Sequence, residues 1–290
     1  MTKTNNSFWN NDKEIQFFKE ALRNFASPEQ LFYTLESGKY AYIPKGNSAD
    51  GKALQSRNSL IGNFTEKWTK SFFSEIAESL NLYAVNSVVC EELGLSKQTS
   101  ADLAFCTTEE IVQKAENIKL ICEVKMSVVS NYKFINEENI ALEGDYHSHK
   151  GQPSLLRSDS MLKAIGKSIN IRVSGTSSTK IPILVLGNTP ITQSYIKKVD
   201  FLKKSGVIQG FISLNPNIEG GGLKESPEKG FQTFLNYKDI ADFCKDLINT
   251  DLNYFSSMLS KSDLGKIITI ANQEKTEIAK AEKFLSLIQS

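Results

Sequence analysis

The hydrophobic positions along the chain follow two spacings, one typical of helices and one typical of strands. Between residues 60 and 80, large apolar side chains recur every four residues and form one broad helical face. These side chains are Phe64, Trp68, Phe72, Ile76 and Leu80. A second helical pattern covers residues 12–25. Ser27 followed by Pro28 then predicts the start of a short helix that reaches about Leu35.

Shorter apolar runs, bounded by turn-forming residues, predict strands. They cover residues 82–90, 101–107, 118–129 and 181–186, and a helical pattern over 158–171 precedes the last of them. Farther on we expect a helix over 192–204, a strand over 207–214, and two or three closing helices, the last over 264–288. This order predicts an α/β fold with helical additions at both ends.

Polar segments that contain glycine predict loops. Residues 38–57 are of this kind, and so are residues 215–231, which contain Gly220-Gly221-Gly222 and predict a flexible loop. We expect the first ten residues to be frayed. The chain then divides into an N-terminal helical segment and loop (1–57), a core (58–214), and a flexible loop with C-terminal helices (215–290), all within one structural unit.

Composition narrows the class of protein. The chain has 290 residues, of which 40% are hydrophobic and 23% charged, the ordinary mixture of a globular protein. No apolar run approaches the roughly 20 residues of a membrane helix, and the N-terminus lacks the apolar core of a signal peptide. We therefore expect a cytoplasmic protein with no membrane partner. The net charge of +1 argues against a histone-like or tail-driven binder but permits a local basic cleft.

The cysteines and histidines argue against several kinds of site. The four cysteines lie far apart without a CxxC spacing, which favours buried free thiols over zinc or disulfides. The only histidines, His147 and His149, leave little room for a zinc site or a Ser-His-Asp triad. No glycine-rich phosphate loop follows a strand, so no nucleotide cofactor is expected.

The segment with the clearest chemistry is the predicted strand around Glu123 and Lys125. Side chains two apart in a strand point to the same side, so this acid and this lysine share a face of an otherwise apolar strand. Burying them without a partner is costly. One interpretation is a half-exposed strand with a charged outer face, and the other is a catalytic pair.

Asp102 favours the catalytic interpretation. It opens the preceding predicted strand, with 20 residues between it and Glu123. An acid at the start of one strand, followed by E-x-K in the next, resembles the active-site hairpin of the PD-(D/E)xK nuclease superfamily. The predicted αβββαβ order over residues 60–187 is similar to that family's core. Ala101 stands where the family usually has proline, and the resemblance leaves both ends of the chain unexplained.

The resemblance implies a restriction-endonuclease-like αβββαβ core with a mixed central sheet. It also implies that Asp102, Glu123 and the carbonyl of Val124 bind Mg²⁺, while Lys125 orients or activates water and stabilises developing negative charge. Glu66 resembles a further acidic position that some members carry at the start of the first core helix. It is also compatible with a solvated boundary glutamate, and Glu75 is the rival acid on the same helix.

Basic residues after the catalytic strand predict the DNA contacts. The loop over residues 146–160 is rich in hydrogen-bond donors and leads into a helix. We expect Arg157 to read a base and Lys150, Lys163 and Lys167 to contact phosphates of double-stranded DNA. An ordinary polar loop before a helix is the alternative. We expect His147 and His149 of this loop on the surface or in contact with DNA.

A type II restriction endonuclease of a restriction-modification system, acting as a homodimer, fits this resemblance best, because cutting both strands of a palindrome calls for two-fold symmetry. Two rival functions stay open. One is a repair or junction-resolving nuclease of the same fold, and the other is a non-catalytic DNA-binding protein.

Overall fold

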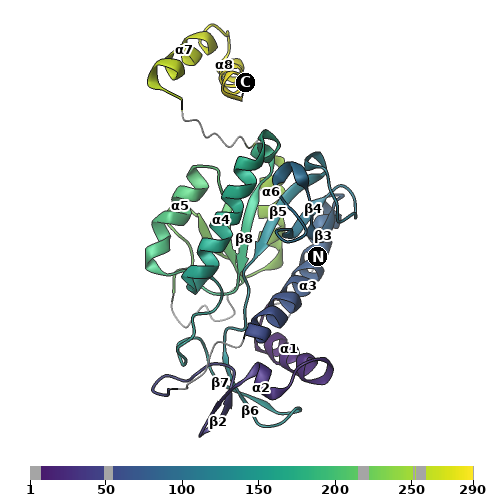
Figure 1. Ribbon diagram of the computed structural model, residues 1–290. Coiled ribbons are helices and arrows are strands. Elements are labelled where there is room, and N and C mark those ends of the chain that lie inside the picture. The colour runs from purple at the N-terminus through teal and green to yellow at the C-terminus, as the bar shows by residue number, and fades with distance from the viewer. Residues whose placement is uncertain (1–7, 49–54, 215–221, 251, 253–258, 290) are drawn as a thin grey trace.

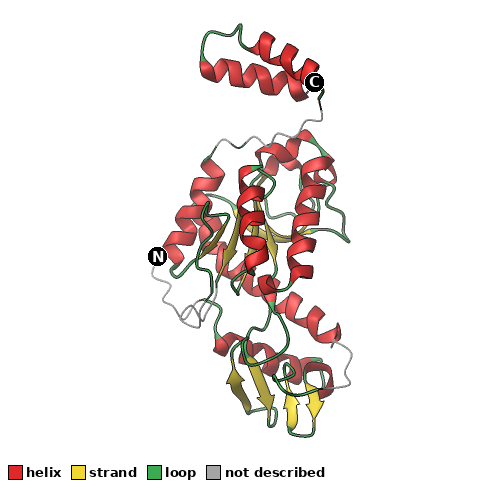
Figure 2. Ribbon diagram, turned by 90° about the vertical axis from the view of Figure 1, so that its left-hand side faces the viewer, coloured by secondary structure: helices red, strands yellow, loops and turns green. Residues whose placement is uncertain are grey.

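A computed structural model describes residues 8–48, 55–214, 222–250, 252 and 259–289. Its centre is the predicted α/β arrangement, a mixed six-stranded sheet in the order β10-β9-β8-β5-β4-β3 (Figures 1 and 2). The strands are β3 (Tyr83–Val88), β4 (Ala101–Cys106), β5 (Ile118–Val124), β8 (Ile183–Gly187), β9 (Gly210–Ser213) and β10 (Phe231–Thr233). The first three pair antiparallel, whereas β5, β8, β9 and β10 run parallel.

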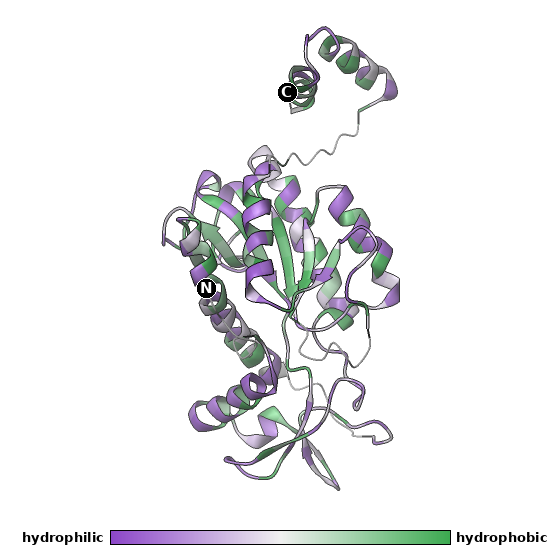
Figure 3. Ribbon diagram, turned by 180° about the vertical axis from the view of Figure 1, so that it is seen from behind, coloured by the Kyte–Doolittle hydropathy of each residue, from purple (hydrophilic) through white to green (hydrophobic). Residues whose placement is uncertain are grey.

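Helices cover both faces of this sheet, and alternation along β8 shows how. Leu184 and Leu186 pack with α3 (Gln55–Ser79) and α6 (Tyr237–Asn249), while Val185 packs with α4 (Ser158–Ser174) and α5 (Ile196–Lys204). A strand buried on both faces is apolar throughout. Accordingly, hydrophobic residues concentrate in the strands of the central sheet (Figure 3). The strands and helices predicted over residues 82–204 are present in the predicted order, but two further strands, at residues 131–134 and 140–144, lie between the third strand and the helix that follows it.

A second, four-stranded antiparallel sheet was not predicted. Its order is β1-β2-β6-β7. The strands are β1 (Tyr33–Leu35), β2 (Gly38–Tyr40), β6 (Asn131–Phe134) and β7 (Ile140–Gly144). It packs with α1 (Asn11–Asn24) and α2 (Pro28–Leu31) below the central sheet in Figure 1. We call this unit the small lobe. Strands of three to five residues are too short to show a clear period of two, so the hydrophobic pattern did not reveal them.

The small lobe corrects several expectations. Residues 38–57 are not all loop, because β2 and the start of α3 lie there. The short helix ends at Leu31 rather than Leu35, and the strand predicted to reach residue 129 ends at Val124. Phe8 and Trp9 are buried in the core, so this part of the first ten residues is not frayed. Residues 1–7 lie outside the described residues.

The C-terminal part also differs from the prediction. Within the expected flexible loop, residues 215–221 lie outside the described residues, but β10 continues the central sheet beside β9. Of the closing helices, α6 buries Ile240 and Cys244 in the main core. The helix expected over residues 264–288 is two helices, α7 (Lys261–Ala271) and α8 (Glu277–Gln289), which pack on each other. Among the described residues, no helix has the length and apolarity to span a membrane.

Candidate active site

The predicted catalytic residues meet at one end of the β4–β5 pair. Leu103 pairs with Cys122 in antiparallel register, which makes Asp102 and Glu123 the next opposed positions. The amide nitrogen of Val124 donates to Asp102 Oδ2 at 2.8 Å and fixes this carboxylate against β5. Alternation along β5 places Glu123 and Lys125 on the same side as Asp102. The sequence therefore predicted the common face of Glu123 and Lys125, and the register of β4 on β5 adds Asp102 to it.

Lys125 bridges the two acids. Its Nζ lies 3.1 Å from Asp102 Oδ2 and 3.3 Å from Glu123 Oε2, and it also donates to the Val124 carbonyl at 3.1 Å. The side chain of Glu123 is 0% exposed, whereas those of Asp102 and Lys125 are 16% and 20% exposed. The site is thus an ionic cluster whose outer members still reach solvent.

Lys167 of α4 completes this cluster, a position that the sequence did not suggest. Its Nζ lies 3.1 Å from Asp102 Oδ1 and 2.6 Å from Glu123 Oε1, and it donates to the Ser100 carbonyl at 2.5 Å. We expected this lysine to contact DNA phosphate. In the structure its ammonium group instead neutralises the two acids, a contact that depends on how α4 packs against the sheet.

The cluster shifts the pKa values of its members in opposite directions. Burial, reinforced by the nearby Asp102 charge, raises the pKa of Glu123. Burial also acts to raise the pKa of Asp102, but Lys125, Lys167 and the Val124 amide together hold it below its ordinary value. Burial would lower the pKa of Lys125, yet the charges of Asp102 and Glu123 raise it. Lys125 is therefore a protonated, positively charged group at neutral pH.

Of the two rival acids on α3, Glu66 is the one electrostatically linked to the cluster. Glu66 is half-buried, and its pKa is raised first by burial and then by the charge of Asp102, with Lys125 and Lys167 opposing. Glu75 is exposed and its charge acts on Tyr237 of α6 instead. Both acids lie on the same predicted helix, and only the packing of α3 on the sheet distinguishes them.

The oxygen atoms of this cluster are ligands of the type that a hard cation prefers. Asp102 and Glu123 offer carboxylate oxygens, and Glu123 Oε1 is buried with Lys167 nearby but no well-directed hydrogen bond. Within the described part of the chain, however, no three acid, histidine or cysteine side chains gather closely enough to hold a metal. A divalent ion would therefore depend on two carboxylates and the Val124 carbonyl, and would compete with the two lysines.

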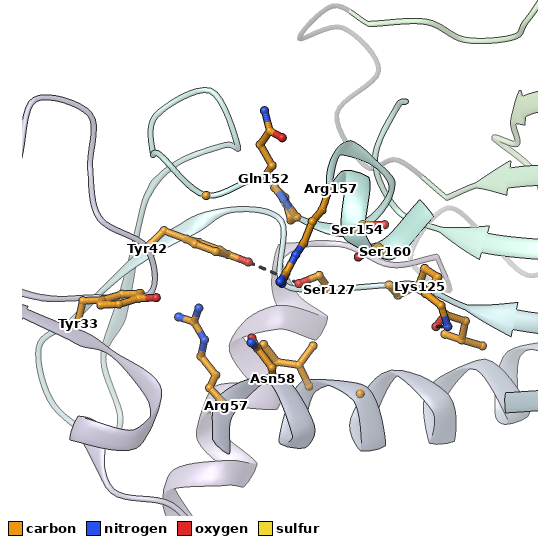
Figure 4. A pocket seen from close by; sticks show the side chains of 16 residues that line it. Tyr33, Tyr42, Arg57, Asn58, Lys125, Ser127, Gln152, Ser154, Arg157 and Ser160 are labelled. Atoms are coloured by element: carbon orange, nitrogen blue, oxygen red, sulfur yellow. Dashed lines mark hydrogen bonds between the residues drawn. The ribbon is translucent and has the colours of Figure 1, made fainter. Parts of the chain in front are cut away.

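A cavity of about 430 Å³ opens beside Lys125, between the small lobe and the core. Figure 4 shows side chains from both sides pointing into it, among them Arg57 of α3, Tyr33 and Tyr42 of the small lobe, and Arg157 before α4. The hydroxyl of Tyr42 donates to the Val128 carbonyl at 2.7 Å. Neither Arg57 nor the two tyrosines stood out in the sequence, because the segments that carry them meet only in the fold.

The other predicted DNA contacts are spread over the surface near this cavity. Lys163 is 71% exposed and forms an ion pair with Asp159 at 3.1 Å, and Arg157 contacts the same carboxylate at 3.4 Å. Lys150 is exposed. Of the histidines, His147 is exposed as expected, but His149 is not a surface residue. It is buried, stacks on Tyr42 with 4.0 Å between ring centroids, and contacts the Val129 carbonyl through Nε2.

Comparison with known proteins adds no relative. No family model matches the chain, and no curated protein or solved structure is significantly similar to it.

Proposed function

We propose that this protein is a magnesium-dependent endodeoxyribonuclease with a restriction-endonuclease-like core. The observation that carries the proposal is the convergence of Asp102, Glu123 and Lys125 at one end of β4 and β5 in a mixed sheet, beside a cavity lined by cations. An acid, a second acid and a lysine on adjacent strands provide what phosphodiester hydrolysis needs, namely carboxylate oxygens for a cation and positive charge for the phosphate.

Each residue has a distinct role in this proposal. Asp102 and Glu123, with the Val124 carbonyl, would hold Mg²⁺, which when bound offsets phosphate charge and acidifies its water. Lys125 carries its proton, so it supports the reaction by placing positive charge next to the reacting phosphate. Lys167 neutralises the acids when DNA is absent and orients Glu123. Glu66 lies near enough to tune the charge of the group.

A type II restriction enzyme is the form of nuclease that we favour. The elements outside the core, the small lobe and the C-terminal helices, are additions of the kind that a site-specific enzyme uses to grip a duplex. We propose that the enzyme acts in the cytoplasm. We also propose that it is a homodimer that cuts a short palindromic site, because its two-fold symmetry would match that of the two DNA strands. A repair or junction-resolving nuclease is the alternative within the same chemistry.

One observation favours a non-catalytic DNA-binding protein. Two lysines and two carboxylates in mutual contact form a neutral set, which could serve as a structural link between α4 and the β4–β5 pair. A structural cluster would have no need of magnesium. Magnesium-dependent cutting of DNA would therefore distinguish a nuclease from a non-catalytic DNA-binding protein.

Purified protein is expected to cut duplex DNA into discrete fragments with magnesium, and to stop completely when EDTA removes the metal. The reason is that neither lysine can supply the activated water that a bound divalent ion provides. Gel electrophoresis of phage or plasmid digests, followed by sequencing of the fragment ends, gives the site. Intact duplex, branched and single-stranded DNA with both magnesium and manganese would support the binding protein instead.

A further inference from the structure

Arg57 is an unusual charge within the cavity beside Lys125. It is 4% exposed, and no carboxylate among the described residues lies within ion-pair distance of it. Its Nη1 donates to the backbone carbonyls of Leu31 and Ala41, but its Nε is buried without a hydrogen-bond partner. Burying an unpaired cation and an unsatisfied donor is costly, so the site is incomplete without a further acceptor.

The guanidinium group is also held in a fixed position. It lies close to two aromatic rings, with Cζ 4.9 Å from the ring centroid of Tyr42 and 5.4 Å from that of Tyr33. Tyr42 is itself stacked with His149. These stacked groups set the plane of Arg57 before any ligand arrives, which lowers the entropic cost of binding.

Among the described residues that line the cavity, every charged side chain is basic: Arg57, Lys125 and Arg157. Arg157 also contacts Asp159 at 3.4 Å, but Asp159 does not line the cavity. Figure 4 shows Arg157 reaching toward Tyr42 and Ser127 from the side opposite Arg57. Two guanidinium groups directed into one cavity repel each other unless an anion lies between them. Planar guanidinium groups match the oxygens of phosphate in particular.

We propose that the cavity binds a phosphate group between Arg57 and Arg157. In the complex with DNA, this is a backbone phosphate that neighbours the scissile phosphate. This inference rests on the proposed nuclease function, because Lys125 lines both the cavity and the catalytic cluster. It also changes the role expected of Arg157, from reading a base to holding the backbone. A free mononucleotide has the same phosphate chemistry and is the other source of the ligand.

The test compares DNA binding by Arg57→Gln and Arg157→Ala with the wild-type protein in EDTA, where cutting is stopped. Each variant is expected to bind a fluorescent duplex roughly 10- to 100-fold more weakly, as for the loss of a charge-assisted hydrogen bond. The loss is expected for every duplex sequence, and the slope of log affinity against log salt is expected to fall by about 1. Fluorescence anisotropy at several salt concentrations measures both.

Arg172→Gln is the matched control for removing a buried arginine. Arg172 is buried too, but its donors go to the Val207, Ser178 and Ile181 carbonyls and to Gln209, far from the cavity. It is expected to lower stability without changing the salt slope. Arg157 is half exposed, so Arg157→Ala keeps the test valid if Arg57→Gln does not fold.

The outcomes separate this inference from the proposed function. The phosphate site would be overturned by two results together. Both cavity variants would bind duplex DNA with the affinity and salt slope of the wild type, and calorimetry would detect no binding of phosphate or dAMP to the wild-type protein. Binding of dAMP that Arg57→Gln removes, with unchanged duplex binding, assigns the site to a free nucleotide. If no metal supports cutting but Arg57 still governs duplex binding, the nuclease proposal fails and the phosphate site stands.

Discussion

Lys125→Ala is expected to reduce DNA cutting by at least about 10²- to 10³-fold, the usual cost of losing a preorganised charge at a reacting oxyanion. Lys125 lines the cavity and also contacts both acids, with Nζ 3.1 Å from Asp102 and 3.3 Å from Glu123. Its removal takes away the positive charge that the phosphate would contact. Duplex binding is expected to remain within about 10-fold of wild type, because other cations still face the DNA.

Cleavage rates under single-turnover conditions, measured beside duplex affinity, check this expectation. Lys119→Ala is the matched control, because Lys119 lies on the same strand with the same side-chain direction but is exposed at the far end. It is expected to cut at the wild-type rate. Cutting that survives Lys125→Ala, in protein that still binds DNA, would remove Lys125 from the catalytic group and leave the carboxylates to be explained separately.

Glu14→Gln is expected to lower the free energy of unfolding by about 2–4 kcal/mol, because a buried donor left without an acceptor costs about 1–3 kcal/mol. Glu14 of α1 is fully buried and accepts four hydrogen bonds. Trp9 Nε1 and the Val129 amide donate to Oε1 at 2.8 and 2.6 Å. The Ser130 amide and the Tyr132 hydroxyl donate to Oε2 at 3.1 and 2.9 Å. An amide NH₂ group would face two of these donors and satisfy neither.

The position of Glu14 gives this loss a consequence for the site. Residues 129 and 130 belong to the segment that leaves the catalytic strand and enters β6 of the small lobe. Glu14 thus ties α1 to the connection between the two sheets that border the cavity. Urea unfolding measures the effect, and Glu20→Gln is the control on the same helix, where the carboxylate accepts only an exposed hydrogen bond from Gln16. Equal stability of the two variants would contradict this account.

The stability loss is also expected to depend on pH. Burial raises the pKa of Glu14 from 4.5 to about 7, against the opposing effect of its four donors. A group whose pKa is raised on folding contributes its full stabilisation below its unfolded pKa and loses it as pH rises through the folded value. The difference in free energy of unfolding between the wild type and Glu14→Gln should therefore narrow as pH rises from about 4.5 to about 7 and stay constant above that.

The sequence supported the central sheet well because its strands are buried on both faces. A short, continuous apolar run such as that of β8 indicates a buried strand, and apolar residues every four positions, as in α3, indicate a helix. The small lobe escaped prediction for the opposite reason. β2 pairs with β6, about 90 positions later in the chain, and each strand is short. Pairing between such distant short segments leaves no local pattern.

The sequence by itself determined that Glu123 and Lys125 share one face of a strand, because side chains alternate along any strand. The register of β4 on β5 decided that Asp102 lies opposite Glu123. The sequence did not determine what meets them there. Lys167 reaches the cluster only through the packing of α4, and Arg57 gains its unpaired, buried character only where α3 meets the small lobe. Local periodicity sets the direction of a side chain within its own element, whereas burial, charge balance and the shape of a cavity arise from contacts between elements that are distant in the chain.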